Sequence, residues 1–478
     1  MRESGGVVHK MTWDTGESLS RAHRARKKKL AAGTGIALDS RIAMTLLAAQ
    51  ILPRMLRMQQ HFPQRPVLDI AAVVRVEVAR MRPHLKPGQR VAVAVGSRGI
   101  ARLAQVVRAL LDELRAAGVQ PFIVPAMGSH GGATPEGQLH VLADYGVTEA
   151  SMGVPIHAAM DAVNLGRTPD GLSALCSAEA LRADGIIIVN RVKPHTDYSS
   201  RTLGSGLIKM LVVGLGKHAG AANFHRSAVH VGYEAALRAI GRVVLARAPV
   251  LFGLALVEHQ HHDLARIEAV SAADIEQREG ELFAESRELL PRLPFEEMDL
   301  LIIDRIGKNI SGPGMDPNVI GRRSHAYSTL LSNELDVHPF IRRIFVRGLT
   351  PETHGNAIGI GMADATTERL ATQMDRHITQ INAQTSLTLH SAKLPIVFAN
   401  DRDAVASMID TLAMDDVRQA RVVRIADTLS MEWMEVSEAF AAEIATRTDI
   451  TATTAPAAME FDAQGNLPDL CTASAAAH

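Results

Sequence analysis

The stretch VAVAVGSRGIARLAQVVRALLDELRAAG (91–118) decides the fold of this chain. Its first five residues, VAVAV (91–95), form a short apolar run that ends at a glycine turn, as expected of a buried strand. The residues after the turn place apolar side chains at helical spacing, and Gly118 follows them where helices commonly end on glycine. A strand, a turn and an amphipathic helix in this order form the repeating unit of α/β sheets.

The same alternation continues along the chain. A helix is expected over 134–146 with Thr134 as its N-cap, and a polar helix is expected from a capping box of Ser271 and Asp274 to Pro291. Strands are expected over 121–127, 185–190, 207–216 and 250–258, and after the polar helix over 299–304, 343–349, 395–400 and 421–427. The sequence therefore predicts an α/β protein of two α/β domains, with the active site in the cleft between them.

The chain is expected to divide into four parts. Residues 1–60 form a polar, basic leader with a helix, because RAHRARKKKL (21–30) is strongly basic and 42–60 has helical spacing. A nucleic-acid-binding arm is the alternative interpretation of this leader, but the neutral total charge favours a solvated segment. The other parts are an N-terminal domain over 61–292, a C-terminal α/β domain over 293–470 and a disordered tail over 471–478.

Composition excludes several classes of protein. The 478 residues include 51 basic and 51 acidic side chains, so the formal net charge of zero argues against a nucleic-acid or membrane-surface binder. The two cysteines, Cys176 and Cys471, are too few for a disulfide framework or a cysteine-type zinc site. The apolar runs are short and interrupted, so we expect a soluble cytoplasmic protein. The sequence gives no basis for predicting the oligomeric state.

Candidate chemical residues lie in loops that follow strands, where open α/β sheets bind their ligands. Arg98, in GSRG (96–99), either clamps a carboxylate or phosphate or is the exposed arginine of a glycine turn. His130 lies among glycines in MGSHGGATPEG (127–137), so a ligand could approach it closely. A histidine there can act as an acid, a base or a metal ligand, although a structural role is the commoner one.

Two further segments add an amine and more imidazoles. His195 follows the strand at 185–190, and Lys209 lies in the apolar run LIKMLVVG (207–214). A lysine in such a run either reaches the surface or has a group to bind or react with. GLGKHAGAANFHRS (214–227) then carries His218 and His225. From spacing alone the chain is a two-domain α/β protein with a histidine-rich cleft and one unusual lysine.

The sequence EHQHH (258–262) has the composition of a metal site. We interpret it as a hairpin turn, because strand-like segments flank it and its histidines would point to different sides of the turn. The close helical spacing of zinc-protease histidines, HExxH, does not occur in the chain.

The order of these elements resembles the nickel-pincer lactate racemase family over most of residues 85–465. Ser97 and Arg98 stand where that family has a Thr-Arg pair after a strand. Gly128-Ser129-His130 matches a GxH element, and Pro194-His195 matches a Pro-His pair. The resemblance implies that His130 and His195 are the acid and base, that Arg98 holds the substrate carboxylate and that Ser97 lies at the cofactor.

The resemblance also implies a cofactor, a nickel-pincer nucleotide built on a pyridinium ring with two sulfur donors. Lys209 falls where the family can tether this cofactor through a thioamide, which would explain a buried lysine because the linked nitrogen carries no ammonium charge. His225, by its spacing from Lys209, falls on the nickel-binding histidine in preference to His218. Two sulfurs, one carbon and one imidazole would give nickel(II) a planar four-coordinate set.

The implied activity is racemisation or epimerisation of an α-hydroxy acid by reversible hydride transfer, with a small hydroxy acid as the partner molecule. The family's substrate loop corresponds to SGPGMDPNVIGRRS (311–324). There Gly321 and Ser324 occupy the glutamine and lysine positions, so Arg322 or Arg323 is expected to contact substrate instead. Two arginines would suit a larger or more acidic hydroxy acid than lactate.

Two other functions stay open at this point. The first is a nicotinamide-dependent dehydrogenase that uses the GSRGIAR turn (96–102), although the third glycine and the acidic residue about 20 positions later are missing. The second is a non-enzymatic protein that holds nickel or its organic cofactor without turnover, which the altered substrate loop would permit.

Overall fold

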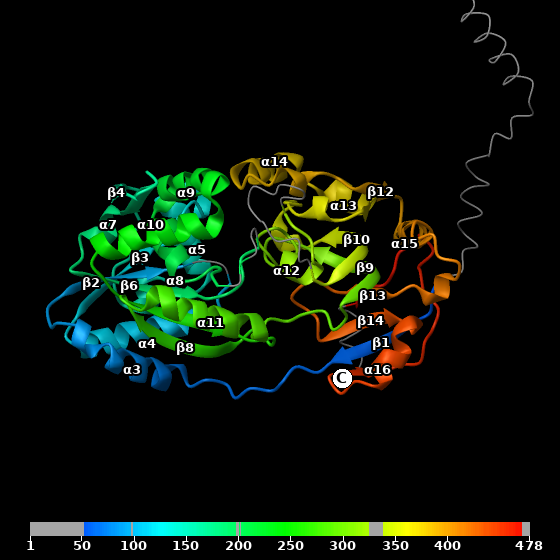
Figure 1. The fold of residues 1–478 in the computed structure, drawn as a ribbon, viewed down its shortest axis with the longest axis horizontal. Helices are drawn as coiled ribbons and strands as arrows, with labels where there is room; N and C mark the ends of the chain where they lie inside the picture. The colour runs from blue at the N-terminus through cyan, green and yellow to red at the C-terminus, as the bar shows by residue number, and fades with distance from the viewer. Residues whose placement is uncertain (1–51, 97–98, 197–199, 201, 325–337, 471–478) are drawn as a thin grey trace, which may run out of the picture. The chain divides into compact units, whose positions relative to one another are not determined.

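The computed structural model describes residues 52–96, 99–196, 200, 202–324 and 338–470. These residues belong to one compact unit. Within them the strands form one sheet of five strands, one of eight and a two-stranded pair, with helices packed against the larger sheets (Figure 1). The prediction of an α/β fold with two sets of strands is therefore confirmed.

The first sheet contains the strands that carry most of the predicted site. Its order is β3 (Gln120–Pro125), β2 (Arg90–Val95), β6 (Gly185–Arg191), β7 (Val250–Glu258) and β8 (Leu264–Ser271). The first four run parallel, and β8 returns antiparallel to β7. Around the sheet lie α3 (Ile70–Arg80), α4 (Leu103–Ala116), α5 (Pro135–Asp144), α6 (Glu149–Met152), α7 (Ala178–Leu181), α8 (Leu207–Lys209), α9 (Lys217–Val231), α10 (Tyr233–Arg247) and α11 (Ile275–Leu289), together with the hairpin of β4 (Ala162–Arg167) and β5 (Ser173–Ser177).

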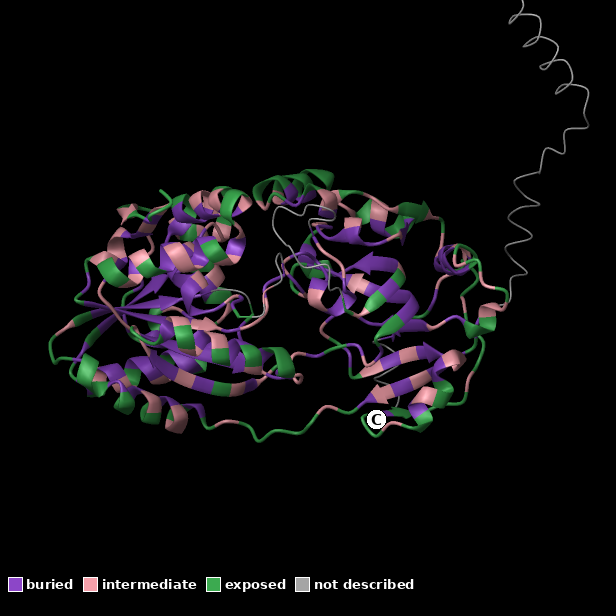
Figure 2. Ribbon diagram, in the orientation of Figure 1, coloured by how far each residue is buried: buried purple, intermediate pink, exposed green. Residues whose placement is uncertain are grey.

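Alternation along the strands explains why helices cover both faces of this sheet. Val91 and Val93 of β2 pack in one apolar cluster with α3 and α4, whereas Ala92 and Ala94 pack in another with α9 and α10. Figure 2 shows most of the length of β2, β3 and β6 buried. A parallel sheet is buried on both faces, so its strands are continuously apolar rather than alternating with polar residues. That is why VAVAV identified the fold so clearly.

The second sheet contains the strands that the sequence placed after the polar helix. Its order is β12 (Ile396–Phe398), β11 (Ala365–Thr367), β10 (Phe340–Leu349), β9 (Glu297–Ile306), β13 (Val422–Ile425), β14 (Trp433–Ser437), β1 (Met55–Gln60) and β15 (Ile450–Ala452). Its helices are α12 (Pro317–Ile320), α13 (Glu368–Gln373), α14 (Arg376–Thr385), α15 (Asp401–Asp410) and α16 (Ala441–Ala445). Strands β12 to β13 are parallel, and β14, β1 and β15 add antiparallel neighbours.

Strand β1 corrects the expectation of a helix over 42–60. Residues Met55–Gln60 are extended and pair with β14 and β15 of the second sheet, so a segment early in the sequence completes the sheet formed by its end. Leu56 and Met58, two residues apart, both pack into the core of that sheet. These contacts outweigh the helical spacing of the sequence. The earlier part of that expected helix, and the leader before it, lie outside the described residues.

The segment 207–216 is helical, and the prediction of a strand there was wrong. Helix α8 runs into a π-helical turn, η3 (Met210–Gly214), and both pack in the core under α9 and α10. Short apolar runs do not distinguish a strand from a buried helix. π-Helical turns are uncommon and occur frequently at functional sites.

Several local predictions are confirmed. Helix α4 ends just before Gly118, whose φ of +79° lies in the left-handed region. Thr134 caps α5 by accepting from the backbone N–H of Gly137, and EHQHH forms the turn between β7 and β8. The capping box of the polar helix is not formed: Asp274 precedes α11, and its carboxylate accepts instead from the Ser271 hydroxyl at 2.6 Å.

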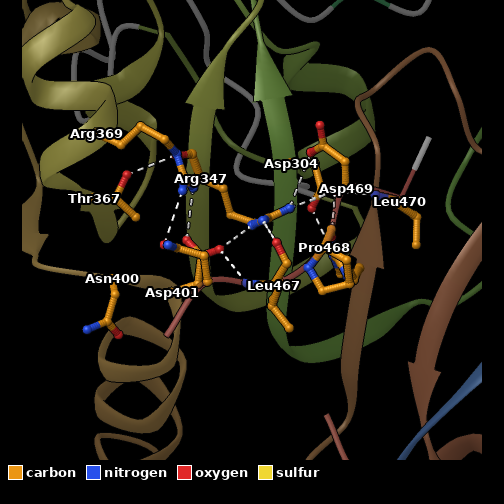
Figure 3. Close-up of polar contacts among 12 residues, drawn as sticks. Asp304, Arg347, Thr367, Arg369, Asn400, Asp401, Leu467, Pro468, Asp469 and Leu470 are labelled. Atoms are coloured by element: carbon orange, nitrogen blue, oxygen red, sulfur yellow. Dashed lines mark hydrogen bonds and ion pairs between the residues drawn. The ribbon is translucent and has the colours of Figure 1, made fainter. Parts of the chain in front are cut away.

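A network of buried charges holds the end of the described chain against the second sheet (Figure 3). Arg347 of β10 is 4% exposed and binds Asp304 and Asp401, each at 2.8 Å. Asp401 in turn accepts from the Leu467 backbone N–H at 2.9 Å, and Asp304 accepts from that of Leu470 at 3.0 Å. Each buried charge thus has an opposite charge and further hydrogen bonds, which buried ion pairs require.

The strands of the first sheet all come before β9 in the sequence. The strands of the second sheet begin with β9, except for β1, which comes first in the chain. The domain boundaries expected from the sequence, 61–292 and 293–470, stay a proposal. In the described part of the chain, helices are too short or too polar for any of them to cross a membrane.

Candidate active site

The predicted site loops leave one edge of the first sheet. Strands β3, β2 and β6 are neighbours and run parallel, so the loops after them start from the same edge. His130 follows β3, and His195 follows β6. Ser97 and Arg98 follow β2 but lie outside the described residues. This edge is where open α/β sheets bind ligands.

His195 and Lys209 are in direct contact. The His195 Nε2 and the Lys209 Nζ are 2.6 Å apart. His195 is only 7% exposed, while Lys209, at the last position of α8, is half-buried rather than buried as expected. At this distance one nitrogen donates a hydrogen bond and the other accepts it. The contact therefore joins a base and an amine at the sheet edge.

Tyr233 links this pair to His225. The His225 Nδ1 and the Tyr233 hydroxyl are 3.2 Å apart, and the His195 and Tyr233 rings lie 5.9 Å apart between centroids. His225 is half-buried on α9, whereas His218 on the same helix is exposed. His225, which the resemblance preferred to His218, is thus in contact with Tyr233, whose ring also lies near His195.

Glu279 of α11 fixes the start of the helix that ends in Lys209. Its carboxylate is fully buried and accepts from the Ile208 backbone N–H at 2.8 Å. Burial raises the pKa of Glu279 to about 7, even though that backbone hydrogen bond favours the charged form. Gly206 is required beside it, because a Cβ there would lie 2.1 Å from the Glu279 Oε1. The position of Lys209 is thus set by a contact with a distant helix.

The loop that carries His130 is bound on two sides. The Gly128 N–H donates to the Gly214 carbonyl at 3.2 Å, which joins the loop to the π-helical turn after Lys209. The Gln138 side chain of α5 donates to the Gly128 carbonyl at 2.9 Å and reaches the His130 carbonyl at 3.4 Å. His130 itself is half-buried. Two different helical segments therefore position this histidine's backbone.

The two arginines of the substrate loop are placed differently. Arg322 binds Asp364 at 2.6 Å and the Met362 carbonyl at 2.7 Å, so its guanidinium lies against the second sheet. Arg323 lines a cavity of about 530 Å³ together with His195 and Asn318. The Asn318 amide also donates to the His195 carbonyl at 3.3 Å. Of the two, Arg323 is the one that shares a cavity with a predicted catalytic histidine.

Sequence reasoning missed four side chains of this site: Gln138, Lys217, Tyr233 and Glu279. Two of them carried a signal. Gln138 lies four residues before the buried Leu142 on α5, and Glu279 lies on the inward face of α11 with other buried residues. A polar side chain at an apolar helical position indicates a buried hydrogen bond, because burial without a partner is costly. Nothing in the local sequence singled out Lys217 or Tyr233.

Fold and site together define an α/β protein with an amine and two imidazoles gathered near the carboxyl edge of a parallel sheet. Residues 44–235 match the family model described as lactate racemase N-terminal domain. This match, over part of the chain, supports the resemblance to the lactate racemase family that the sequence indicated. The matched domain is of the racemase type, which suggests an isomerase.

Comparison with solved structures gives weaker likenesses. A protein from Thermotoga maritima is 13% identical over 69% of this chain and 84% of its own, with a TM-score of 0.46. The lactate racemase apoprotein from Thermoanaerobacterium thermosaccharolyticum is 10% identical over 79% of this chain and 89% of its own, with a TM-score of 0.44. No curated protein matches the sequence. The likeness to the lactate racemase family therefore rests on the matched domain.

Proposed function

We propose that this protein is a racemase or epimerase of an α-hydroxy acid that works with a nickel-pincer nucleotide. The observation that carries the proposal is the contact of Lys209 with His195, with His225 joined through Tyr233, inside a lactate racemase N-terminal domain. An amine for the tether and an imidazole for proton transfer are thus in contact, and an imidazole for the metal is joined to them through Tyr233.

The donor set is compatible with this cofactor. Among the described residues, no three His, Cys, Asp or Glu side chains gather as a metal site. A pincer nucleotide brings three of the four donors itself, so the protein needs to supply one imidazole, which we assign to His225. Metal-binding histidines commonly bond their other ring nitrogen to a polar group, and the Tyr233 hydroxyl occupies that position at Nδ1.

Each residue then has a definite task. When bound, the cofactor supplies an acceptor for hydride, a reaction that protein side chains cannot perform. Removing hydride avoids forming a carbanion beside an ionised carboxylate. One of His195 and His130 would take the hydroxyl proton of the substrate as hydride leaves the carbon. The other would donate a proton when hydride returns to the opposite face, and in the reverse reaction the two histidines would exchange these roles. By the resemblance, Lys209 and Ser97 would hold the cofactor, and Arg98 would hold the substrate carboxylate.

We further propose that the substrate is larger or more acidic than lactate. The substrate loop has arginines at 322 and 323 and lacks the family's glutamine and lysine at Gly321 and Ser324. Arg322 was the expected contact, and its ion pair with Asp364 makes Arg323 the better placed of the two. A guanidinium binds a second carboxylate through two nitrogens.

The test is isomerisation of a panel of α-hydroxy acids by the full chain produced with the cofactor. His130→Ala and His195→Ala should each abolish turnover, whereas His218→Ala should leave it unchanged because His218 is exposed. The proposal is wrong if both substitutions at the site leave isomerisation intact. Tight NADH binding would favour the dehydrogenase, and cofactor retention without turnover of any acid would favour the carrier.

A further inference from the structure

Lys217 is a completely buried lysine that the proposed chemistry does not use. Its side chain is 0% exposed, at the first position of α9. Its backbone φ is +56°, in the left-handed region that an L residue adopts only at some cost. A glycine would adopt this backbone freely, and an apolar side chain would be buried without the penalty of a charge. The amine must therefore serve the structure around it.

The amine of Lys217 bonds to two acceptors that flank the His130 loop. Its Nζ donates to the Pro125 carbonyl at 2.6 Å, where β3 ends and the loop begins. It also approaches the Gln138 Oε1 at 3.3 Å, on the helix where the loop ends. Both acceptors are oxygens, so charged and neutral forms of the amine can make both bonds, because even a neutral amine has two N–H groups.

The contact with Lys217 orients the amide of Gln138. A side-chain amide has an oxygen at one end and an NH₂ group at the other, and an amine donor selects the oxygen. The NH₂ group of Gln138 is then directed to the Gly128 and His130 carbonyls. Gln138 is 0% exposed, so water does not compete for these bonds. The two side chains form a continuous path of hydrogen bonds from α9 to the backbone of His130.

Close packing of the loop makes this support effective. Gly131 and Gly137 lie backbone to backbone, and a Cβ on Gly137 would come within 1.8 Å of the Gly131 carbonyl oxygen. The loop therefore rests on the first turn of α5, one residue from Gln138. A misplacement of about 1 Å at a reacting group can reduce a rate by about a hundredfold.

We propose that Lys217 and Gln138 are positioning residues that hold the His130 loop in its working geometry. This inference rests on the proposed function only in giving His130 a catalytic role. The structural part, that the pair fixes the loop, holds whatever reaction the protein catalyses.

The first test is amide hydrogen exchange on the full chain, followed at Gly128 and His130 and compared with the strand β6. Gln138→Leu and Lys217→Met should each increase exchange in the loop by about tenfold or more relative to β6. Leu142→Ala is the matched control, because it damages the same helix α5 but removes neither hydrogen bond. Equal loop exchange in Gln138→Leu and the parent would overturn the proposal, even if Lys217→Met fails to fold.

The second test uses the active enzyme. Gln138→Glu keeps an acceptor for Lys217 but presents an oxygen to two carbonyls, so kcat should fall by about tenfold or more while KM changes less than about twofold. A loss of the same size in Leu142→Ala would show that general stability is responsible, and would overturn the positioning role. If both Gln138→Glu and His130→Ala keep full turnover, the proposed function is wrong. If Gln138→Glu keeps full turnover but His130→Ala does not, the positioning role is wrong.

Discussion

Replacing Lys217 by methionine should change how the stability of the protein depends on pH. Burial lowers the pKa of Lys217 to about 8 from the ordinary value of 10.5, although Cys176 and Glu179 nearby favour the charged form. The unfolded chain therefore binds this proton more tightly than the folded chain. The free energy of unfolding must then increase as the pH rises from about 8 to about 10.5, and the folded state carries the full penalty below that range.

The size of the effect follows from the two pKa values. At pH 7 the difference disfavours the folded state by about 3 kcal/mol, and at pH 10 by less than about 1 kcal/mol. The wild-type protein should therefore gain about 2.5 kcal/mol from this one group between pH 7 and pH 10. Lys217→Met lacks the titration, although it leaves the Pro125 carbonyl and Gln138 without their donor and loses stability at both pH values for that reason.

The assay is urea unfolding followed by far-ultraviolet circular dichroism at both pH values. Because other side chains titrate in this range, the informative quantity is the difference between wild type and Lys217→Met. That difference should grow by about 2.5 kcal/mol in favour of wild type at pH 10. A difference that is the same at both pH values within about 1 kcal/mol would refute the reasoning, as would a Lys217 pKa above about 10 measured by NMR.

Three further predictions concern other buried polar groups. Burial raises the pKa of Glu279 to about 7, so the wild type should lose stability as the pH rises from about 4.5 through 7, whereas Glu279→Gln lacks this titration. The stability of Glu279→Gln relative to wild type, measured by urea unfolding, should therefore be greater at pH 8 than at pH 5. An equal difference at both pH values would contradict this. Arg347→Met should cost about 3 kcal/mol because it removes the buried cation that Asp304 and Asp401 share, even though each carboxylate keeps one other arginine. Arg369→Met, at a side chain 38% exposed, should cost less than about 1 kcal/mol in the same assay; equal losses would be the contrary result. Tyr233→Phe should weaken nickel retention by about tenfold or more by removing the partner of His225, and retention equal to wild type would exclude that role.

The first sheet could be predicted from the sequence because its local signals agree with its tertiary environment. VAVAV is apolar throughout, and the sheet buries both faces of that strand. Gly118 and Thr134 have the backbone and the side-chain oxygen that helix ends require, so the neighbouring helices were expected close to their observed bounds. In these elements the conformation that the local sequence favours is the same as the one that the tertiary fold requires.

Other elements depend on contacts that a local sequence does not contain. Met55–Gln60 becomes a strand because the far end of the chain supplies β14 and β15 as partners. The run 207–216 is apolar enough for a strand, but Glu279, about 70 residues later, binds the backbone at Ile208 and starts a helix. Propensity is a weak guide when such distant contacts decide.

The candidate site shows the same division. His130 and His195 were selected by their places after strands, a rule that depends on topology alone. The contact of Lys209 with His195, and the roles of Tyr233 and Lys217, depend on how helices pack and could not be read from spacing. The sequence therefore named candidate residues for the site, but not the residues that position them.

The most direct test of the central claim is the nickel content of the full chain, co-produced with enzymes that build the pincer nucleotide. Elemental analysis should give about one nickel per chain for the parent and for His218→Ala, and much less for His225→Ala, because one imidazole completes the coordination of the metal. Nickel absent from the parent, or retained equally by His225→Ala, would contradict the proposed cofactor and its ligand.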